Sequence, residues 1–189
     1  ARPDVAREAC RLLGIDEADV VVDATRRPNL SVRDGRDLRD REGALVSVVA
    51  PGQKTIVYVS SRDQSVQLVR TLRHRLPELA DRIAFYNAGL SREVRARIER
   101  AFRDGGLSCI VSTSAFGEGV NLPDVRDVVL YGLPYGAVEL NQMSGRAGRD
   151  GLPARVHMLF SARDMRVNER VISQAAPARD DLVALYRAI

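Results

Sequence analysis

Short β-branched runs that alternate with amphipathic segments most limit how this chain can fold. Turn residues bound the runs, and most segments between them place apolar residues three and four positions apart, as an amphipathic helix does. The predicted strands lie at residues 20–22, 55–59, 83–86, 108–111, 128–131 and 155–160. Strands that alternate with helices predict an α/β fold, with a mainly parallel sheet, right-handed crossovers and helices on both faces.

Capping and stop signals outline the helices between these strands. Ser61 and Ser91 each precede an amphipathic segment, as helix N-caps do, and Pro77 and Gly105 follow those segments. The predicted helices lie at residues 1–14, 34–49, 62–76, 92–104, 162–174 and 180–189. We therefore expect one domain of ordinary size that is followed by a helical tail.

Composition excludes several classes of protein. No run approaches the ~20 apolar residues of a membrane span, and the first residues do not form a signal peptide, so we expect a cytoplasmic protein without a membrane partner. Cys10 and Cys109 lack metal-ligand spacing, which predicts two buried, reduced thiols and no metal site. The net charge of +4 is compatible with a nucleic-acid partner.

Polar residues follow three of the predicted strands. The three segments lie at 60–62, 86–89 and 112–113. Because the carboxyl ends of parallel strands meet at one edge of a sheet, we expect these segments to share a surface. Hydroxyls, backbone amides and an arginine are groups that hold a nucleic-acid backbone without reading its sequence.

A glycine-bearing turn carries two arginines three residues apart. Arg146 and Arg149 can lie on one side of a helical turn, where they would form a phosphate clamp. Phosphoryl transfer uses such a clamp, because a guanidinium stabilises the charge that builds on the departing phosphate. Gly145 and Gly148, which have no β-carbon, would let the backbone approach a phosphate closely. The alternative is a solvated basic turn without function.

Two segments resemble sequence motifs of a known family. Residues 115–126 and 142–151 are similar to motifs V and VI of superfamily 2 helicases, and specifically of the RecQ family of DNA helicases. The element Arg27-Pro28-Asn29 resembles the one that opens the second motor lobe in that family. The resemblance covers residues 27–161, and it implies a RecA-like, three-layer α/β/α lobe at 25–161, the end of a first lobe at 1–24 and a helical tail at 162–189.

The resemblance also implies a nucleotide site. Arg149 would be the arginine finger that reaches the ATP γ-phosphate, with Arg146 as its partner and Gln142 coupling the nucleotide to the DNA strand. Gly119 and Asn121 would approach the ribose and phosphate edge of ATP. The sequence has no Walker A loop and no acidic Mg²⁺-binding motif, so ATP and Mg²⁺ would be bound mainly by the first lobe.

The resemblance further implies a track for DNA, single-stranded or partly duplex. Four residues would contact DNA phosphates: Ser61, Arg62, Gly89 and Thr113. Arg95 matches an arginine for which we expect a structural role.

The chain departs from the family pattern at two positions. Asn87 replaces a common histidine and can still donate to a phosphate, whereas Glu118 replaces a common methionine and puts a carboxylate beside an anionic ligand. An RNA helicase, another superfamily 2 translocase and a non-catalytic nucleic-acid-binding module are the alternative interpretations. The four-cysteine zinc module that usually follows this lobe in RecQ helicases does not occur in these residues.

Overall fold

The computed structural model of the protein describes residues 3–16, 27–36, 38–116 and 122–175. Its elements are α1 (Pro3–Leu13), β1 (Leu30–Asp34), α2 (Arg41–Val49), β2 (Thr55–Tyr58), α3 (Arg62–Arg75), the 3₁₀ helix η2 (Pro77–Arg82), β3 (Ile83–Tyr86), α4 (Arg92–Arg103), β4 (Cys109–Ser112), β5 (Asp127–Leu130), α5 (Ala137–Ser144), β6 (Ala154–Met158) and α6 (Ala162–Ala175).

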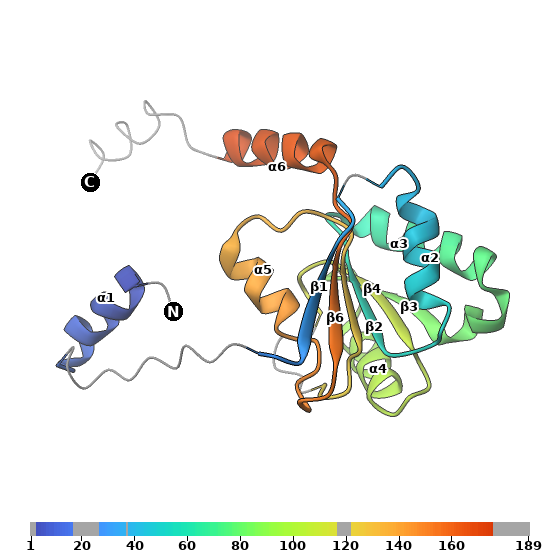
Figure 1. Cartoon of the computed structure of the whole chain (residues 1–189), viewed down its shortest axis with the longest axis horizontal. Helices are drawn as coiled ribbons and strands as arrows, with labels where there is room; N and C mark the ends of the chain where they lie inside the picture. Colours follow the sequence, from blue (N-terminus) through green and yellow to red (C-terminus); the bar gives the residue numbers. More distant parts are fainter. Residues whose placement is uncertain (1–2, 17–26, 37, 117–121, 176–189) are drawn as a thin grey trace.

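The six strands form one parallel sheet in the order β1-β6-β5-β2-β4-β3 (Figure 1). The central strands β2, β4 and β5 are buried along their whole length, which explains their nearly continuous apolar runs. Thr55 of β2 is in register with Cys109 of β4 on one side and with Asp127 of β5 on the other. The predicted parallel α/β fold is therefore confirmed.

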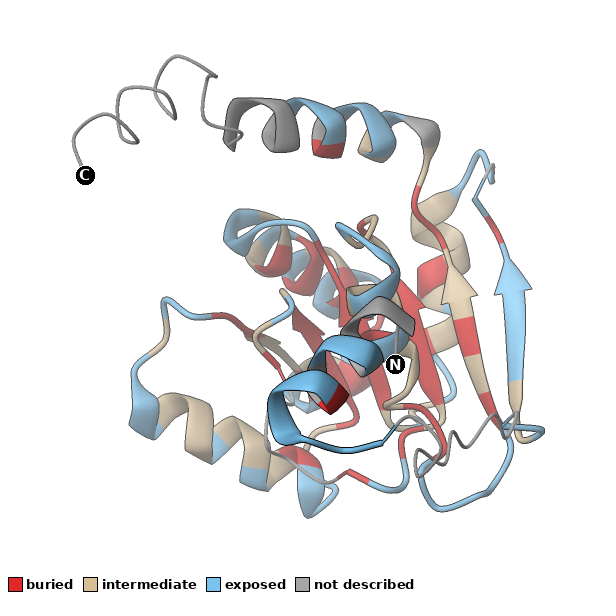
Figure 2. Ribbon diagram, turned by 90° about the vertical axis from the view of Figure 1, so that its left-hand side faces the viewer, coloured by how far each residue is buried: buried red, intermediate tan, exposed pale blue. Residues whose placement is uncertain are grey.

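Helices cover both faces of the sheet, so the molecule has three layers (Figure 1). Because successive side chains of a strand point to opposite faces, Ile56 and Tyr58 pack in the core beneath α4 and α5. Val57 and Val59 pack in the second core, beneath α2 and α3. Figure 2 shows the buried residues gathered along the central strands between these helices.

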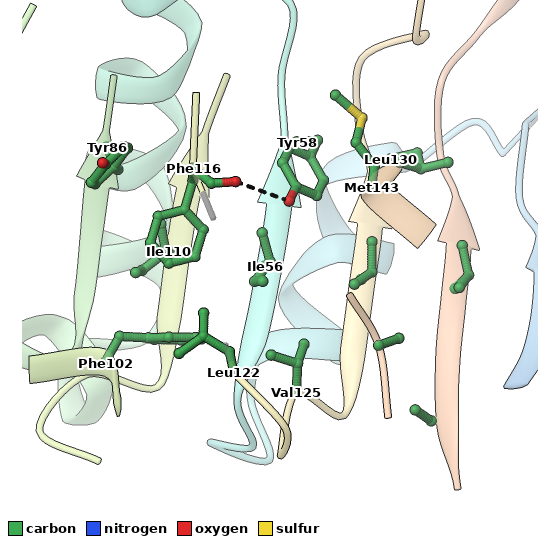
Figure 3. Close-up of a cluster of buried hydrophobic side chains, with 14 of the residues drawn as sticks. Ile56, Tyr58, Tyr86, Phe102, Ile110, Phe116, Leu122, Val125, Leu130 and Met143 are labelled. Atoms are coloured by element: carbon green, nitrogen blue, oxygen red, sulfur yellow. Dashed lines mark hydrogen bonds between the residues drawn. The ribbon is translucent and has the colours of Figure 1, made fainter. Parts of the chain in front are cut away.

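Aromatic side chains fill the core beneath α4 and α5 (Figure 3). The ring of Phe116 makes edge-to-face contacts with Tyr86 and Phe102, with ring centroids 4.9 and 5.7 Å apart. Phe116 follows β4, so this packing fixes the point where the chain leaves the sheet for residues 117–121.

The predicted helix at 34–49 is wrong in its first half. Residues 30–34 form β1, which was not predicted, and the helix begins only at Arg41, where Asp40 accepts a hydrogen bond from the Gly43 amide. α5 was not predicted either. The predicted strand at 20–22 and helix at 180–189 lie outside the described residues.

The first helix stands away from the sheet. In Figure 1, α1 lies apart from the strands, and its Leu12 and Leu13 are exposed. Within the described part of the chain, no helix has the length and apolar character needed to cross a bilayer. Cys10 and Cys109 are both buried free thiols, as predicted.

Candidate nucleotide and nucleic-acid site

Residues 145–151, here called the arginine loop, follow α5 and carry Arg146 and Arg149. Successive turns continue the helix through Gly145, Arg146 and Ala147, whose amides donate to carbonyl oxygens three or four residues earlier. The loop is then fixed to the chain before β5, because the amide of Gly148 donates to Val125 O over 2.8 Å. Ala147 is fully buried, so it anchors the loop in the core between the two arginines.

Gly148 is required by backbone conformation and by space. Its φ is +54°, a region that side chains with a β-carbon rarely adopt. A β-carbon there would also lie 2.7 Å from Asn29 Nδ2 and 2.8 Å from the side chain of Ala154. The space beside Gly148 is therefore filled by protein atoms, and the expectation that it makes room for a phosphate is wrong.

The two arginine side chains have different surroundings. Arg149 is exposed, and its Nε donates to Gly145 O over 3.2 Å. It has no ion-pair partner among the residues that the structure describes. Arg146 is half-buried and lies close enough to the Tyr58 hydroxyl for its positive charge to act on that group. The guanidinium of Arg149 is therefore available for an anionic ligand.

Tyr58 was not predicted as a site residue, yet it lies beside the arginine loop. Its ring is buried at the end of β2, and its hydroxyl donates to Phe116 O over 3.5 Å (Figure 3). Burial raises the pKa of Tyr58 to about 12, although the nearby Arg146 opposes that rise, so the hydroxyl stays protonated at neutral pH. Tyr58 thus bonds to Phe116 and lies close to Arg146 of the arginine loop.

The other predicted nucleotide residues are less defined. Gln142 is exposed in the last turn of α5, before the arginine loop. Gly119 and Asn121 lie outside the described residues, as does Glu118. The described part of the chain holds no group of three or more His, Cys, Asp or Glu side chains that could hold a metal ion.

The predicted DNA-contacting residues lie at the carboxyl edge of the sheet. Ser61 caps α3, because its Oγ accepts from the Gln64 amide over 3.1 Å. A β-carbon placed on Gly89 would lie 3.7 Å from Nη1 of Arg62, so these two residues are neighbours. Thr113, half-buried after β4, lines a narrow pocket together with Ser60 and Tyr58. The pocket thus lies between the predicted DNA-contacting edge of the sheet and α5, whose Met143 also lines it.

Asn87 does not face the solvent. It is buried, its Nδ2 donates to Ser65 Oγ over 3.1 Å, and its Oδ1 accepts from the Gly89 amide over 3.0 Å. The expectation that Asn87 donates to a phosphate is therefore wrong. Asn87 instead links the loop that carries Gly89 to α3.

Arg95 lies on α4 beside the end of β3. It lies near the Tyr86 hydroxyl, which donates to Glu99 Oε1, also on α4, over 2.5 Å. The bond from Tyr86 to Glu99 ties α4 to the strand that precedes Gly89, and the structural role expected for Arg95 stays a prediction.

Arg27 and Asn29 are two further residues that contact the arginine loop. The Arg27 guanidinium donates to three carbonyl oxygens of the loop, and the Asn29 side chain donates to Gly148 O over 2.8 Å and Leu152 O over 2.9 Å. In the sequence, these residues stand out only as part of an element that resembles one of RecQ helicases. Their partners lie more than 115 positions later in the chain, so no local pattern could have revealed the contact.

A larger cavity lies at the opposite, amino ends of β1 and β6. Its volume is about 480 Å³, and it is lined by residues that include Ser31, Gln53, Arg126 and Arg155. Both arginines already pair with carboxylates, Arg126 with Asp150 and Arg155 with Asp127. The positive charge in this cavity is therefore largely neutralised.

Comparison with known proteins identifies similar sequences. The family described as the helicase conserved C-terminal domain matches residues 40–151. A putative ATP-dependent RNA helicase of Acanthamoeba polyphaga mimivirus is 29% identical over 173 residues, which cover 90% of this chain and 31% of the relative. The probable ATP-dependent DNA helicase RecS of Bacillus subtilis is 28% identical over 195 residues, which cover 100% of this chain and 38% of the relative. The chain thus spans about a third of the length of these relatives.

A solved structure shares the fold. The DEAD-box protein SrmB of E. coli, in its complex with the regulator of ribonuclease activity A, superimposes with a TM-score of 0.60 at 21% identity. The match covers 72% of this chain and 79% of that one.

Proposed function

Since this chain belongs to the helicase conserved C-terminal domain family, as the RecQ-like C-terminal lobe of a superfamily 2 helicase, we propose that it is the second motor lobe of an ATP-dependent DNA helicase. In this proposal the lobe occupies residues 25–161, between the end of a first lobe at 1–24 and a helical tail at 162–189. The lobe supplies an arginine finger to ATP and part of a track for single-stranded DNA.

The availability of the Arg149 guanidinium carries the nucleotide half of the proposal. An exposed arginine on a loop with a fixed backbone is positioned before any ligand arrives, so little reorganisation is needed when charge develops on the γ-phosphate. Its planar fork can donate to two phosphate oxygens at once and stays charged at any working pH. Arg146 supports it from the Tyr58 side, and Gln142 lies one turn earlier.

ATP and Mg²⁺ would be held mainly by the first lobe in the complete protein. Phosphoryl transfer needs a loop that cradles the β- and γ-phosphates and a metal ion that bridges them. These residues contain neither a Walker A loop nor an acidic Mg²⁺-binding motif. The contribution of this chain is limited to electrostatic stabilisation from the second side of the nucleotide. We therefore expect the chain by itself to have negligible ATPase activity.

The carboxyl edge of the sheet supports the DNA half of the proposal. The Ser61 oxygen accepts from its own helix, so its hydroxyl hydrogen remains available to a phosphate, as does the guanidinium of Arg62. The Gly89 amide already donates to Asn87, so Gly89 acts by letting the backbone of DNA approach closely. Such contacts hold phosphates without selecting a sequence, which suits a translocating motor.

Replacement of Arg149 in the complete helicase tests the proposal. Arg149→Ala should lower the kcat of DNA-stimulated ATP hydrolysis by about 10³-fold or more, as loss of an arginine finger does, with little change in affinity for single-stranded DNA. Arg70→Ala, which removes an exposed arginine from α3, is the matched control and should leave kcat unchanged. Unchanged turnover in Arg149→Ala would remove this residue from the finger role.

An RNA helicase is the second candidate, favoured by the name of the mimivirus relative. Unwinding assays of the complete protein on matched DNA and RNA duplexes separate the two. A non-catalytic nucleic-acid-binding module predicts that the complete protein hydrolyses no ATP with either polymer, so the same assay tests that interpretation.

A further inference from the structure

The carbonyl groups of the arginine loop converge on one side chain. Nη1 of Arg27 donates to Gly145 O over 3.1 Å, and Nη2 donates to Ala147 O over 2.8 Å and Gly148 O over 2.5 Å. These carbonyls follow the carboxyl end of α5, where helical carbonyls lose their intrahelical partners and a positive charge is favourable. The Arg27 guanidinium meets all three carbonyls at once, whereas their other donors reach one carbonyl each: Arg149 Nε donates to Gly145 O, and the Gly151 amide donates to Gly148 O.

Asn29 completes the contact from the same segment. Its Nδ2 donates to Gly148 O and Leu152 O, and its own carbonyl accepts from the Ala154 amide over 2.9 Å, at the start of β6. Asn29 therefore connects Gly148, inside the arginine loop, to the residues that lead from the loop into β6. The absence of a β-carbon at Gly148 is what allows this approach.

This arrangement orients the two arginines of the loop. The carbonyls of Gly145, Ala147 and Gly148 point toward Arg27, and the buried Ala147 side chain points into the core. Arg149, two residues after this anchor, is left exposed. Moving the carbonyls would rotate the backbone that carries Arg146 and Arg149.

We propose that Arg27 and Asn29 are positioning residues for ATP hydrolysis, which act by holding the backbone of the arginine loop so that Arg149 reaches the γ-phosphate. The inference rests on the proposed function of Arg149. In this proposal the segment that leads into β1 and the arginine loop move together as one rigid unit, although they are far apart in the sequence.

Kinetics of the complete helicase test the inference. Arg27→Ala should lower the kcat of DNA-stimulated ATP hydrolysis by about 100-fold, which a shift of about 1 Å in a catalytic group can cost, while the KM for ATP and the affinity for DNA change little. Arg27→Lys keeps a charge at the end of α5 but cannot donate to three carbonyls in a plane, so it should keep the fold and still lose most of the turnover. Arg33→Ala removes an exposed arginine from β1 itself and should behave as the wild type.

A double-mutant cycle separates positioning from a general structural defect. The background is Arg149→Lys, in which the residual kcat is measured first. In this background Arg27→Ala should lower kcat much less than it does in the wild type, because the Arg149 guanidinium that Arg27 positions is already gone. Losses that multiply would overturn the inference, as would wild-type kcat in both Arg27 variants. If Arg149→Ala keeps full turnover, the finger role itself fails. If Arg149→Ala is inactive but the Arg27 variants are active, only the positioning role fails.

Discussion

The hydroxyl of Tyr58 donates to the carbonyl oxygen of Phe116 over 3.5 Å, at the end of the central strand β2. Burial raises the pKa of the same hydroxyl, and the positive charge of the nearby Arg146 opposes that rise. One buried group thus bonds to one of the segments that resemble helicase motifs and lies close to the other. We expect it to help hold the two segments in place relative to each other.

Tyr58→Phe tests this relationship, because it removes the hydroxyl and keeps the ring. In the complete helicase we expect kcat for ATP hydrolysis to fall about fivefold at unchanged KM, since the loss of one hydrogen bond is worth roughly 1 kcal/mol. Steady-state ATPase assays at saturating DNA measure the effect. Tyr131→Phe is the control, because that ring lies against Arg41 on the opposite face of the sheet. Equal kcat in Tyr58→Phe and wild type would show that the hydroxyl does not position Arg146.

The central sheet could be predicted from the sequence because its strands are buried on both faces. Residues 55–58 and 127–130 have no exposed side to interrupt their apolar runs, apart from the buried Thr55 and Asp127. β1 was missed because it is an edge strand whose residues 31–34 are exposed, so its polar side chains obscured the pattern. The charged stretch that follows it led to a predicted helix that was too long.

The site was predictable only where its residues are close together in the sequence. Arg146 and Arg149 stand out because they share one short loop, and Ser61 stands out because a cap is a local feature. The contact between Arg27 and the loop leaves no such trace, since its acceptors are backbone carbonyls that any residue provides. Tyr58 looked like an ordinary core residue, and its hydrogen bonds depend on how distant segments pack.

Gly148→Ala should destabilise the chain by about 2–5 kcal/mol. The left-handed backbone conformation costs roughly 1–2 kcal/mol with a β-carbon, and overpacking against Asn29 and Ala154 adds roughly 1–3 kcal/mol. Gly105→Ala is the matched control: its φ is +83°, but a β-carbon there would meet nothing within 4 Å. Urea denaturation of both variants measures the difference. Equal losses would show that the arginine loop yields to a methyl group without strain.

Asp127→Asn should make the free energy of unfolding less dependent on pH in the acidic range. Burial alone would raise the pKa of Asp127, but hydrogen bonds from His157 and Arg155, both 2.8 Å from Oδ1, outweigh burial and lower it. A carboxyl whose pKa is lowered by folding adds stability above its unfolded pKa, about 3.9, and this gain is lost as the pH falls through the folded value. We expect Asp127→Asn to cost about 1.5–3 kcal/mol between pH 5 and 7, because the buried group loses the charge that strengthens its hydrogen bonds, while Arg155 remains partly exposed to solvent.

Denaturant titrations over a pH series check this expectation. The difference between wild type and Asp127→Asn should narrow as the pH falls below about 3.9, where the carboxyl of the unfolded chain takes up a proton, and should close once the pH is below the lowered pKa of the folded state. Asp34→Asn breaks an exposed pair with Arg36 and should change stability little at any pH, because solvent screens that pair. A constant difference down to pH 2 would contradict the proposed role of the ionised carboxylate.

Asn87 and Arg62 should affect DNA binding in different ways. If Arg62 contacts a DNA phosphate, as proposed, Arg62→Ala should weaken single-stranded DNA binding and reduce the slope of log K against log salt by about 1. Asn87→Ala removes the hydrogen bonds that hold Gly89 and α3 together, so it should also weaken binding, by about tenfold if the loop moves away. Its salt slope should match that of the wild type, because no cation is lost. Fluorescence anisotropy of a labelled oligonucleotide measures both the affinity and its salt slope. The titrations cover 50 to 200 mM salt, roughly the range over which phosphate contacts dominate binding. An unchanged slope in Arg62→Ala would mean that Arg62 is only a solvated charge, and the DNA track would then have to lie elsewhere on the lobe.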